Sequence, residues 1–260
     1  MGELRAEVRL FASLETLLQE AAEEFVELAQ AAVRAKDLFA VALSGGSTPR
    51  GLYGLLAASP FQERVPWSKI HFFWGDERHV PPDHPDSNYR MAHEAMLSKV
   101  PVLAQNIHRI PAEKEAKRAA ADYEEALREF FRLGGGQWPR FDLILLGMGP
   151  DGHTASLFPH TDALQEQARL VAAPWIEKLS GFRITLTPPV LNRAACVIFI
   201  ATGAEKAEVL RQVIQGSYQP ELYPAQLVRP ASGRLLWLVD RESARLLPLA
   251  SESAKRNEGR

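Results

Sequence analysis

The stretch FDLILLGMGPDGHTASLFP, from Phe141 to Pro159, decides the fold. Its apolar run from Leu143 to Leu146 is typical of a buried strand. A glycine-rich turn follows immediately and carries an acid, Asp151, and an imidazole, His153. Turns at the carboxyl ends of parallel strands are where α/β sheets place reactive side chains. Histidine is the commonest general acid or base near neutral pH, and an acid two residues away can orient it. The stretch therefore predicts an active site with Asp151 and His153 as catalytic residues.

The same residues also spell G-x-G-x-x-G, the fingerprint of dinucleotide binding. That motif needs a helix that opens at its third glycine, yet Pro159 follows six residues after His153. The acidic residue that the motif requires about twenty residues further on is also missing. We therefore predict no nucleotide cofactor. A purely structural turn with an incidental histidine remains the alternative for this segment.

A second glycine-rich turn follows the apolar strand that ends at Leu43. Small residues at a helix start expose backbone N–H groups and hydroxyls, which together suit a phosphate or another anion. Thr48 is the predicted N-cap and Pro49 the first-turn proline of that helix. The lysine of a Walker loop is absent, and a simple capped turn is the alternative. The predicted anion-binding residues are Ser44, Gly45, Gly46, Ser47 and Thr48.

Charged residues form two further candidate groups. The strand from Ile70 to Trp74 runs into a glycine and a charged cluster that includes Asp76 and Arg78. Arg183 begins the strand RITLT, and Lys206 lies in the first turn of a predicted helix. A cation at a helix N-terminus opposes the helix dipole, which makes sense if an anion lies between the two basic residues. A solvated lysine is the alternative. Metal binding by the loop histidines His79 and His84 is disfavoured, because they lack metal-ligand spacing.

Composition limits the possible partners. The net charge of −2 gives no electrostatic reason to expect nucleic acid or an anionic membrane as a partner. No apolar run reaches the ~18 residues that a membrane span needs, and the N-terminus lacks a signal-peptide core. The single cysteine, Cys196, lies in an apolar strand and is predicted to be inert packing. The expected compartment is the cytoplasm. The sequence leaves the oligomeric state open.

Alternating strands and helices predict an α/β fold, with three layers around a mostly parallel sheet. We predict one domain over residues 1–260, with GGGQWP as a helix-to-strand loop and a frayed polar tail over 251–260. The predicted strands are 8–11, 38–43, 70–74, 141–146, 183–187, 197–201 and 235–239. The predicted helices begin near residues 14, 49, 87, 113, 204 and 241.

Taken together, the four groups resemble the 6-phosphogluconolactonase family, within the larger group that includes glucosamine-6-phosphate deaminases. The matching stretches are SGGSTP, WGDERHVP with DSNYR, GMGPDGHTASLFP, RITLTPPVLN and ATGAEKA. They spread from Ser44 to Lys206 and cover most of the chain. The resemblance implies a Rossmann-like sheet. It also implies hydrolysis of 6-phosphogluconolactone in the oxidative pentose phosphate pathway, without a metal or nucleotide cofactor.

Carried over residue by residue, the family's catalytic histidine corresponds to His153, with Asp151 beside it. The phosphate loop corresponds to residues 44–48, and Gly149 belongs to the matching turn. Arg183 and Lys206 match residues that hold phosphate in the related deaminases. The resemblance thus implies a small-molecule sugar-phosphate lactone as the ligand, with Asp76 and Arg78 as further polar positions of the site.

One departure separates the two activities of this larger group. The deaminases resemble DGHIAFNEP, with a glutamate five residues after the histidine, where this chain has Phe158. An isomerising deaminase needs that additional acid–base group, whereas a lactonase only adds water to a carbonyl. Phe158 therefore favours the lactonase. The alternatives are an aminosugar-phosphate isomerase/deaminase and a non-catalytic sugar-phosphate sensor.

Overall fold

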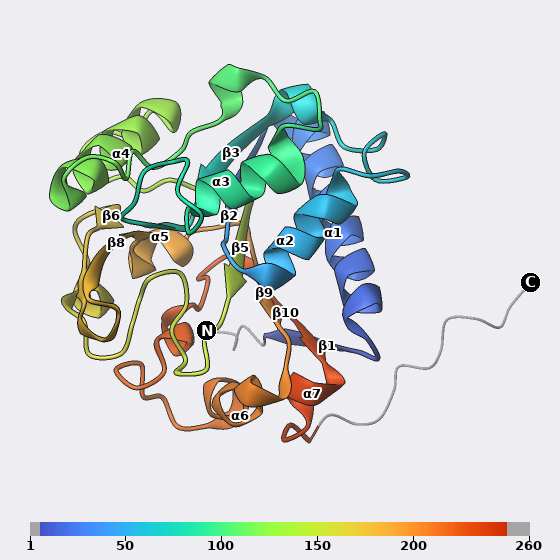
Figure 1. Ribbon diagram of the computed structural model, residues 1–260, viewed down its shortest axis with the longest axis vertical. Coiled ribbons are helices and arrows are strands. Elements are labelled where there is room, and N and C mark those ends of the chain that lie inside the picture. The colour runs from blue at the N-terminus through green and yellow to red at the C-terminus, as the bar shows by residue number, and fades with distance from the viewer. Residues whose placement is uncertain (1–5, 249–260) are drawn as a thin grey trace, which may run out of the picture.

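The computed structural model describes residues 6–248 and is built around a six-stranded sheet in which every neighbouring pair of strands is parallel (Figure 1). The strand order is β1-β10-β9-β5-β2-β3. The inner strands of such a sheet are buried on both faces, which explains the continuous apolar runs in β2, β5 and β9. The strands are β1 (Glu7–Phe11), β2 (Phe39–Leu43), β3 (Ile70–Trp74), β5 (Leu143–Gly147), β9 (Cys196–Ala201) and β10 (Arg234–Asp240).

Helices cover both faces of this sheet, so the predicted three-layer α/β fold is confirmed. In Figure 1, α1, α2 and α3 lie on one side, and α4 and α5 lie on the other. Ser13 is the N-cap of α1 and forms a capping box with Thr16. The helices are α1 (Leu14–Lys36), α2 (Ser47–Leu56), α3 (Asn88–Ala92), α4 (Ala116–Phe130), α5 (Pro188–Leu191), α6 (Ala207–Gln215) and α7 (Arg241–Ala244).

The structure contains a small antiparallel sheet beside the main one, and the sequence analysis did not predict it. Its centre is β8 (Gly181–Leu186), which pairs with β4 (Asp76–Arg78), β6 (Val171–Ala172) and β7 (Trp175–Ile176). Strands of two or three residues are too short to show an apolar periodicity, and only their partner β8 was predicted. This sheet matters for the site, because it joins the segment after β3 to the strand that carries Arg183.

Several predicted helix boundaries are wrong. The N-cap of α2 is Gly46, with φ of 107°, and Thr48 lies inside the helix. The helix predicted from residue 113 through Leu133 to the glycine triplet is shorter: α4 begins at Ala116 and ends at Phe130, and Arg132 has a positive φ of 53°. Lys206 belongs to a short 3₁₀ turn that precedes α6. Local propensity fixes helix ends poorly because tertiary contacts decide the last turn.

One continuous apolar core includes residues from β2, β3, β5, β9 and β10, and the partly buried Val8 and Phe11 of the edge strand β1 pack against it. Cys196 is buried in this core, and burial raises the pKa of its thiol to about 11. Its thiolate form is therefore scarce at neutral pH, in agreement with inert packing. Within residues 6–248, no helix is long and apolar enough to cross a membrane. The predicted tail over 251–260 lies outside the described residues.

A pair of histidines packs beside the edge strand β3. The ring nitrogens of His71 and His108 lie 3.0 Å apart, and His108 stacks on Phe73 with ring centroids separated by 4.4 Å. Burial lowers the pKa of both imidazoles, and the neighbouring His71 helps to lower the pKa of His108 to about 4. The folded protein therefore keeps this pair neutral under conditions in which the unfolded chain binds protons.

We expect this pair to make the protein acid-sensitive. The unfolded chain binds more protons than the folded one between the ordinary pKa of 6.5 and the folded value of about 4, so the free energy of unfolding falls as pH falls through this window. Urea unfolding from pH 8 to pH 4 measures the slope. His108→Gln should flatten the curve, whereas the same change at exposed His84 should not. Identical slopes for the wild type and His108→Gln would contradict the assignment.

Candidate active site

The predicted site residues lie where the sheet changes direction. Strands β2 and β5 are neighbours, but the chain continues from β2 to β3 on one side and from β5 to β9 on the other. In open α/β sheets, ligands bind outside the carboxyl ends of the strands at such a switch point. The turn 44–48 follows β2, and the turn 148–153 follows β5. The topology thus brings together two turns that are about a hundred residues apart in sequence.

A cleft of about 490 Å³ opens at this switch point. It lies between the two glycine-rich turns, β4, β8 and the start of α6. Every predicted site residue except Asp151 lines it, and Asp151 contacts the cleft through His153. The predicted residues that line the cleft are Ser44, Gly45, Gly46, Ser47, Thr48, Asp76, Arg78, Gly149, His153, Arg183 and Lys206.

His153 and Asp151 form a hydrogen-bonded pair. The Nδ1 atom of His153 contacts Oδ1 of Asp151, which also accepts the backbone N–H of His153 at 3.2 Å. Burial raises the pKa of Asp151, but the bonds from His153 and Lys178 outweigh it and hold that pKa well below its usual range. Asp151 therefore stays ionised. With Nδ1 engaged, the second ring nitrogen of His153 is the atom available for proton transfer.

Two residues that the motifs did not assign to this pair complete its surroundings. Lys178 donates from Nζ to Oδ2 of Asp151, the oxygen that His153 leaves free. Phe158 stacks on the imidazole of His153, with centroids 4.1 Å apart and an interplanar angle of 21°. Phe158 thus holds the ring in place by packing. No spacing in the sequence connects Lys178 with Asp151, because the contact spans 27 residues and depends on the small sheet.

Gly149 allows this arrangement by lacking a side chain. A Cβ atom at Gly149 would lie 2.1 Å from Nδ1 of His153 and 2.8 Å from Oδ1 of Asp151, closer than atoms can approach. The N–H of Gly149 donates to the carbonyl of His153, and the N–H of Gly152 donates to the carbonyl of Gly149. These two N–H groups stabilise the turn and are already engaged by backbone acceptors.

We therefore expect Gly149→Ala to displace His153 and lower kcat about tenfold, because misplaced catalytic groups lose most of their advantage. The fold should survive, since the clash is with side-chain atoms at the edge of the core. Steady-state kinetics and thermal unfolding measure the two effects separately. Gly54→Ala is the control, because a Cβ there meets nothing within 4 Å. An unchanged kcat in Gly149→Ala would contradict the role of this close approach.

The turn after β2 has the properties of an anion site. The N-cap of α2, Gly46, makes no side-chain capping bond, so the helix dipole and its first N–H groups face the cleft. The hydroxyl of Ser44 is buried, and its Oγ has no hydrogen-bond partner among residues 6–248. The hydroxyl of Tyr53 accepts from the N–H of Ser44 and donates to its carbonyl, which fixes the turn. A ligand oxygen would satisfy the donors that remain.

Basic side chains face this turn across the cleft. Arg78 and Arg183 stand directly opposite each other in the antiparallel pair of β4 and β8. Like charges in that position are unfavourable without an anion between them. Burial lowers the pKa of Arg183, with a contribution from Arg78, and burial also lowers the pKa of Lys206. Within residues 6–248, none of these three cations forms an ion pair, which leaves them available to a ligand.

The acidic residues after β3 organise the cleft wall. Oδ2 of Asp76 accepts a hydrogen bond of 2.7 Å from the hydroxyl of Ser156, and Asn88 donates to the Asp76 carbonyl at 3.0 Å. Glu77 is buried, where it accepts backbone N–H groups at the start of α3, and burial raises its pKa. Asn88 and Ser156 are cleft residues that the motifs did not single out. Asp76 thus connects three segments of the wall.

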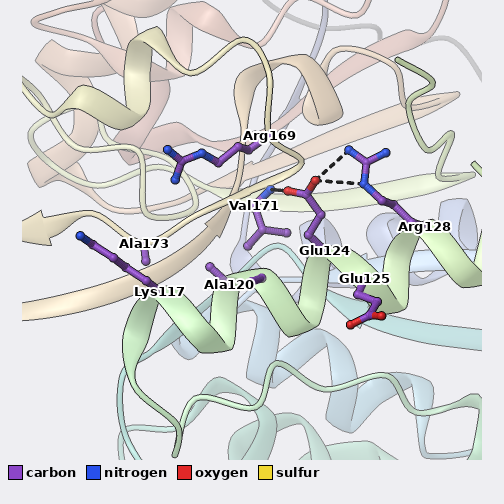
Figure 2. A pocket seen from close by; sticks show the side chains of 9 residues that line it. Lys117, Ala120, Glu124, Glu125, Arg128, Arg169, Val171 and Ala173 are labelled. Atoms are coloured by element: carbon purple, nitrogen blue, oxygen red, sulfur yellow. Dashed lines mark hydrogen bonds and ion pairs between the residues drawn. The ribbon is translucent and has the colours of Figure 1, made fainter. Parts of the chain in front are cut away.

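Other groups that could have formed a site do not. His79 contacts the backbone carbonyl of Lys114, outside the cleft, and no metal-binding group of three or more His, Cys, Asp or Glu side chains occurs within residues 6–248. A second cavity of about 460 Å³ lies between α4 and β6 (Figure 2). There Glu124 pairs with Arg128 of its own helix and accepts the backbone N–H of Val171 in β6 at 3.4 Å, so its carboxylate links α4 to the small sheet.

The fold and the cleft define a Rossmann-like α/β protein with a histidine–aspartate pair, a glycine-rich turn and the basic side chains Arg78, Arg183 and Lys206 at the switch point of its sheet. The family model "Glucosamine-6-phosphate isomerases/6-phosphogluconolactonase" matches residues 12–237. The chain belongs to this family.

Named relatives agree with this membership. The chain is 48% identical to a 6-phosphogluconolactonase of Nostoc sp. over 210 residues, which are 80% of this chain and 85% of that protein. It is 38% identical to a probable 6-phosphogluconolactonase of Arabidopsis thaliana, with 92% of each chain covered. The solved structure of 6-phosphogluconolactonase from Trypanosoma brucei has a TM-score of 0.84 and 30% identity, covering 94% of this chain and all of that one.

Proposed function

We propose that this protein hydrolyses 6-phospho-D-glucono-1,5-lactone to 6-phosphogluconate, a step of the oxidative pentose phosphate pathway. The observation that carries the proposal is the hydrogen-bonded His153–Asp151 pair, whose imidazole lines the same cleft as the turn 44–48, Arg183 and Lys206. The names of the relatives support the same substrate. We further propose that residues 1–260 act as one domain, in the cytoplasm, with this small molecule as the partner.

Substrate binding begins at the phosphate. The turn 44–48 offers N–H groups, the dipole of α2 and the unsatisfied hydroxyl of Ser44, and Arg183 and Lys206 add positive charge. The binding energy of the phosphate, which is remote from the reacting bond, holds the lactone carbonyl near His153. The phosphate therefore acts as a handle that orients the reacting end of the substrate.

His153 then acts as a general base. Its free ring nitrogen takes a proton from a water molecule as that water attacks the lactone carbonyl carbon. Asp151 holds the ring through Nδ1 and stabilises the positive charge that the ring acquires. A tetrahedral intermediate forms, and its oxyanion needs a donor. Because the N–H groups of Gly149 and Gly152 are engaged within their turn, we assign this role to Arg78.

Collapse of the intermediate completes the reaction. The bond from the carbonyl carbon to the ring oxygen breaks, and protonated His153 gives its proton to that oxygen. The product is the open-chain acid, and His153 returns to its neutral state. The proposed steps use only side chains of the cleft and water.

Phe158 distinguishes this reaction from the deaminase alternative. It stands where the resemblance places the deaminase glutamate, and its ring is packed on His153. Phe158 cannot move a proton, so the ring-opening and isomerisation steps lack their acid–base group.

A direct assay tests the proposal. Purified protein is mixed with freshly made 6-phosphogluconolactone, and acid production is measured above the spontaneous rate. The His153→Ala variant serves as the control for contaminating activity. We expect rapid hydrolysis and no ammonia release from glucosamine-6-phosphate. Ammonia release would favour the isomerase/deaminase, and tight binding of 6-phosphogluconate without turnover would favour the sensor.

A further inference from the structure

The carboxylate of Asp151 is divided between two partners. One oxygen, Oδ1, contacts Nδ1 of His153, and the other, Oδ2, accepts from Nζ of Lys178. Lys178 belongs to a 3₁₀ turn, Glu177–Leu179, that leads into β8. The side-chain ammonium group that contacts Asp151 therefore comes from the segment that leads into the small sheet, and not from the turn that carries His153 and Asp151.

A second contact fixes the position of this lysine. Its Nζ lies 4.6 Å from the centroid of the Phe158 ring, a cation–π distance, and Phe158 in turn stacks on His153. Lys178, Asp151, His153 and Phe158 thus form a closed set of contacts. An ordinary surface ion pair has no such second contact and contributes little. Lys178 also lines the catalytic cleft together with His153.

The charge of Lys178 has a chemical consequence for the base. A carboxylate beside an imidazole favours the protonated ring, and a protonated ring cannot accept a proton from water. A cation on the same carboxylate offsets this effect, because it neutralises the negative charge that the ring experiences. The lysine thereby lets Asp151 orient His153 without forcing it into the protonated form.

We propose that Lys178 is a positioning residue that holds Asp151 against His153 and keeps His153 unprotonated near neutral pH. This inference rests on the proposed function, since it concerns the same catalytic pair. It makes Lys178 a determinant of the pH at which the enzyme works.

Other charged groups near the His153–Asp151 pair also influence its protonation, in the wild type and in a Lys178 variant. The β4 strand and the loop after it contribute Asp76, Arg78 and Asp86, β8 contributes Arg183, and the start of α6 contributes Lys206. These groups line the cleft, but none of them forms a hydrogen bond with Asp151 or His153 among residues 6–248. They act equally on the wild type and on a Lys178 variant, so a change at Lys178 isolates its own contribution.

The test is the pH dependence of kcat/KM for the Lys178→Met variant. Removal of the cation should raise the apparent pKa of the acid limb by about 0.5–1 pH unit, a size that allows for a half-exposed lysine. At pH values below the limb, kcat/KM should then be about 3- to 10-fold lower than in the wild type. Lys178→Arg retains the charge and should restore the wild-type limb.

Lys114→Met is the matched control. Lys114 also pairs with an aspartate, Asp122, and its side chain is as exposed as that of Lys178, at 51% in both cases. It lies outside the cleft, so its removal should leave the acid limb in place. An unchanged limb in Lys178→Met, or an equal shift in Lys114→Met, would overturn the inference.

A titration of the His153 ring by NMR separates this inference from the proposed function. The pKa of the ring can be measured in the wild type and in Lys178→Met without any turnover. Thermal unfolding checks that both proteins are folded. An upward shift in a protein that fails to hydrolyse the lactone would support the role of Lys178 and reject the function. Lactone hydrolysis with no shift of the ring pKa would support the function and reject the role of Lys178.

Discussion

Replacement of His153 by alanine should lower kcat for lactone hydrolysis by roughly 10²- to 10⁴-fold, the usual contribution of general base catalysis. The reason is that water must then lose its proton to solvent, and no other imidazole lines the cleft among residues 6–248. The fold should persist, because the ring is partly exposed and lies at the carboxyl edge of the sheet. Initial rates corrected for spontaneous hydrolysis give the measurement.

Two further variants define how the pair works. Asp151→Asn should cause a smaller loss than His153→Ala, because it removes the orienting charge and leaves the base in place. His79→Ala should have no comparable effect on kcat, since His79 contacts a backbone carbonyl outside the cleft. A near-wild-type kcat in His153→Ala would reject the catalytic assignment.

The phosphate contacts should show the second largest effect. Arg183→Ala and Lys206→Ala should each weaken kcat/KM for the phosphorylated lactone by about 1.5–3 kcal/mol, the range for a hydrogen bond to a charged group. The cause is the loss of a cation that has no ion-pair partner among residues 6–248 and faces the anion site. Kinetics with 6-phosphogluconolactone measure the loss, and competitive inhibition by 6-phosphogluconate should weaken in the same variants.

Unphosphorylated gluconolactone provides the internal control for these variants. It should be a poor substrate of the wild type, and neither substitution should change its kcat/KM further, because the contact with phosphate is already absent. Partial unfolding would depress both substrates together. Equal losses on both lactones, or no loss on either, would mean that Arg183 and Lys206 do not recognise the phosphate and that the turn 44–48 acts alone.

The local sequence was sufficient to predict the strands of the main sheet and the two glycine-rich turns that follow them. The apolar runs 39–43, 70–74 and 143–146 form strands of the parallel sheet. The inner strands 39–43 and 143–146 are wholly apolar because they are buried on both faces, whereas the edge strand 70–74 accommodates the partly buried His71. The glycine-rich turns after two of them were predicted to carry the site, and both line the cleft. Such turns are recognisable because glycine is needed wherever backbone or a neighbouring side chain approaches closely.

Other parts of the site have no local signature. The strands β4, β6 and β7 are too short to show a pattern, so the sequence did not indicate that Arg78 and Arg183 face each other. The helix N-cap at Gly46 was misplaced at Thr48, because Gly46 caps through its backbone and not through a side chain. Ser156 and Asn88 reach Asp76 across long separations that no motif records.

The sequence by itself determined the local features of the candidate site. These are the His153–Asp151 spacing, the small residues from Ser44 to Thr48, and the apolar strands that place both turns at one edge of the sheet. These features depend on neighbouring residues, and neighbours are visible in a sequence. The tertiary structure alone decided which charged side chains contact one another, above all that Lys178 contacts the second carboxylate oxygen of Asp151. The physical reason is that electrostatic interactions depend on distances in space, and the fold sets these distances through contacts between distant segments.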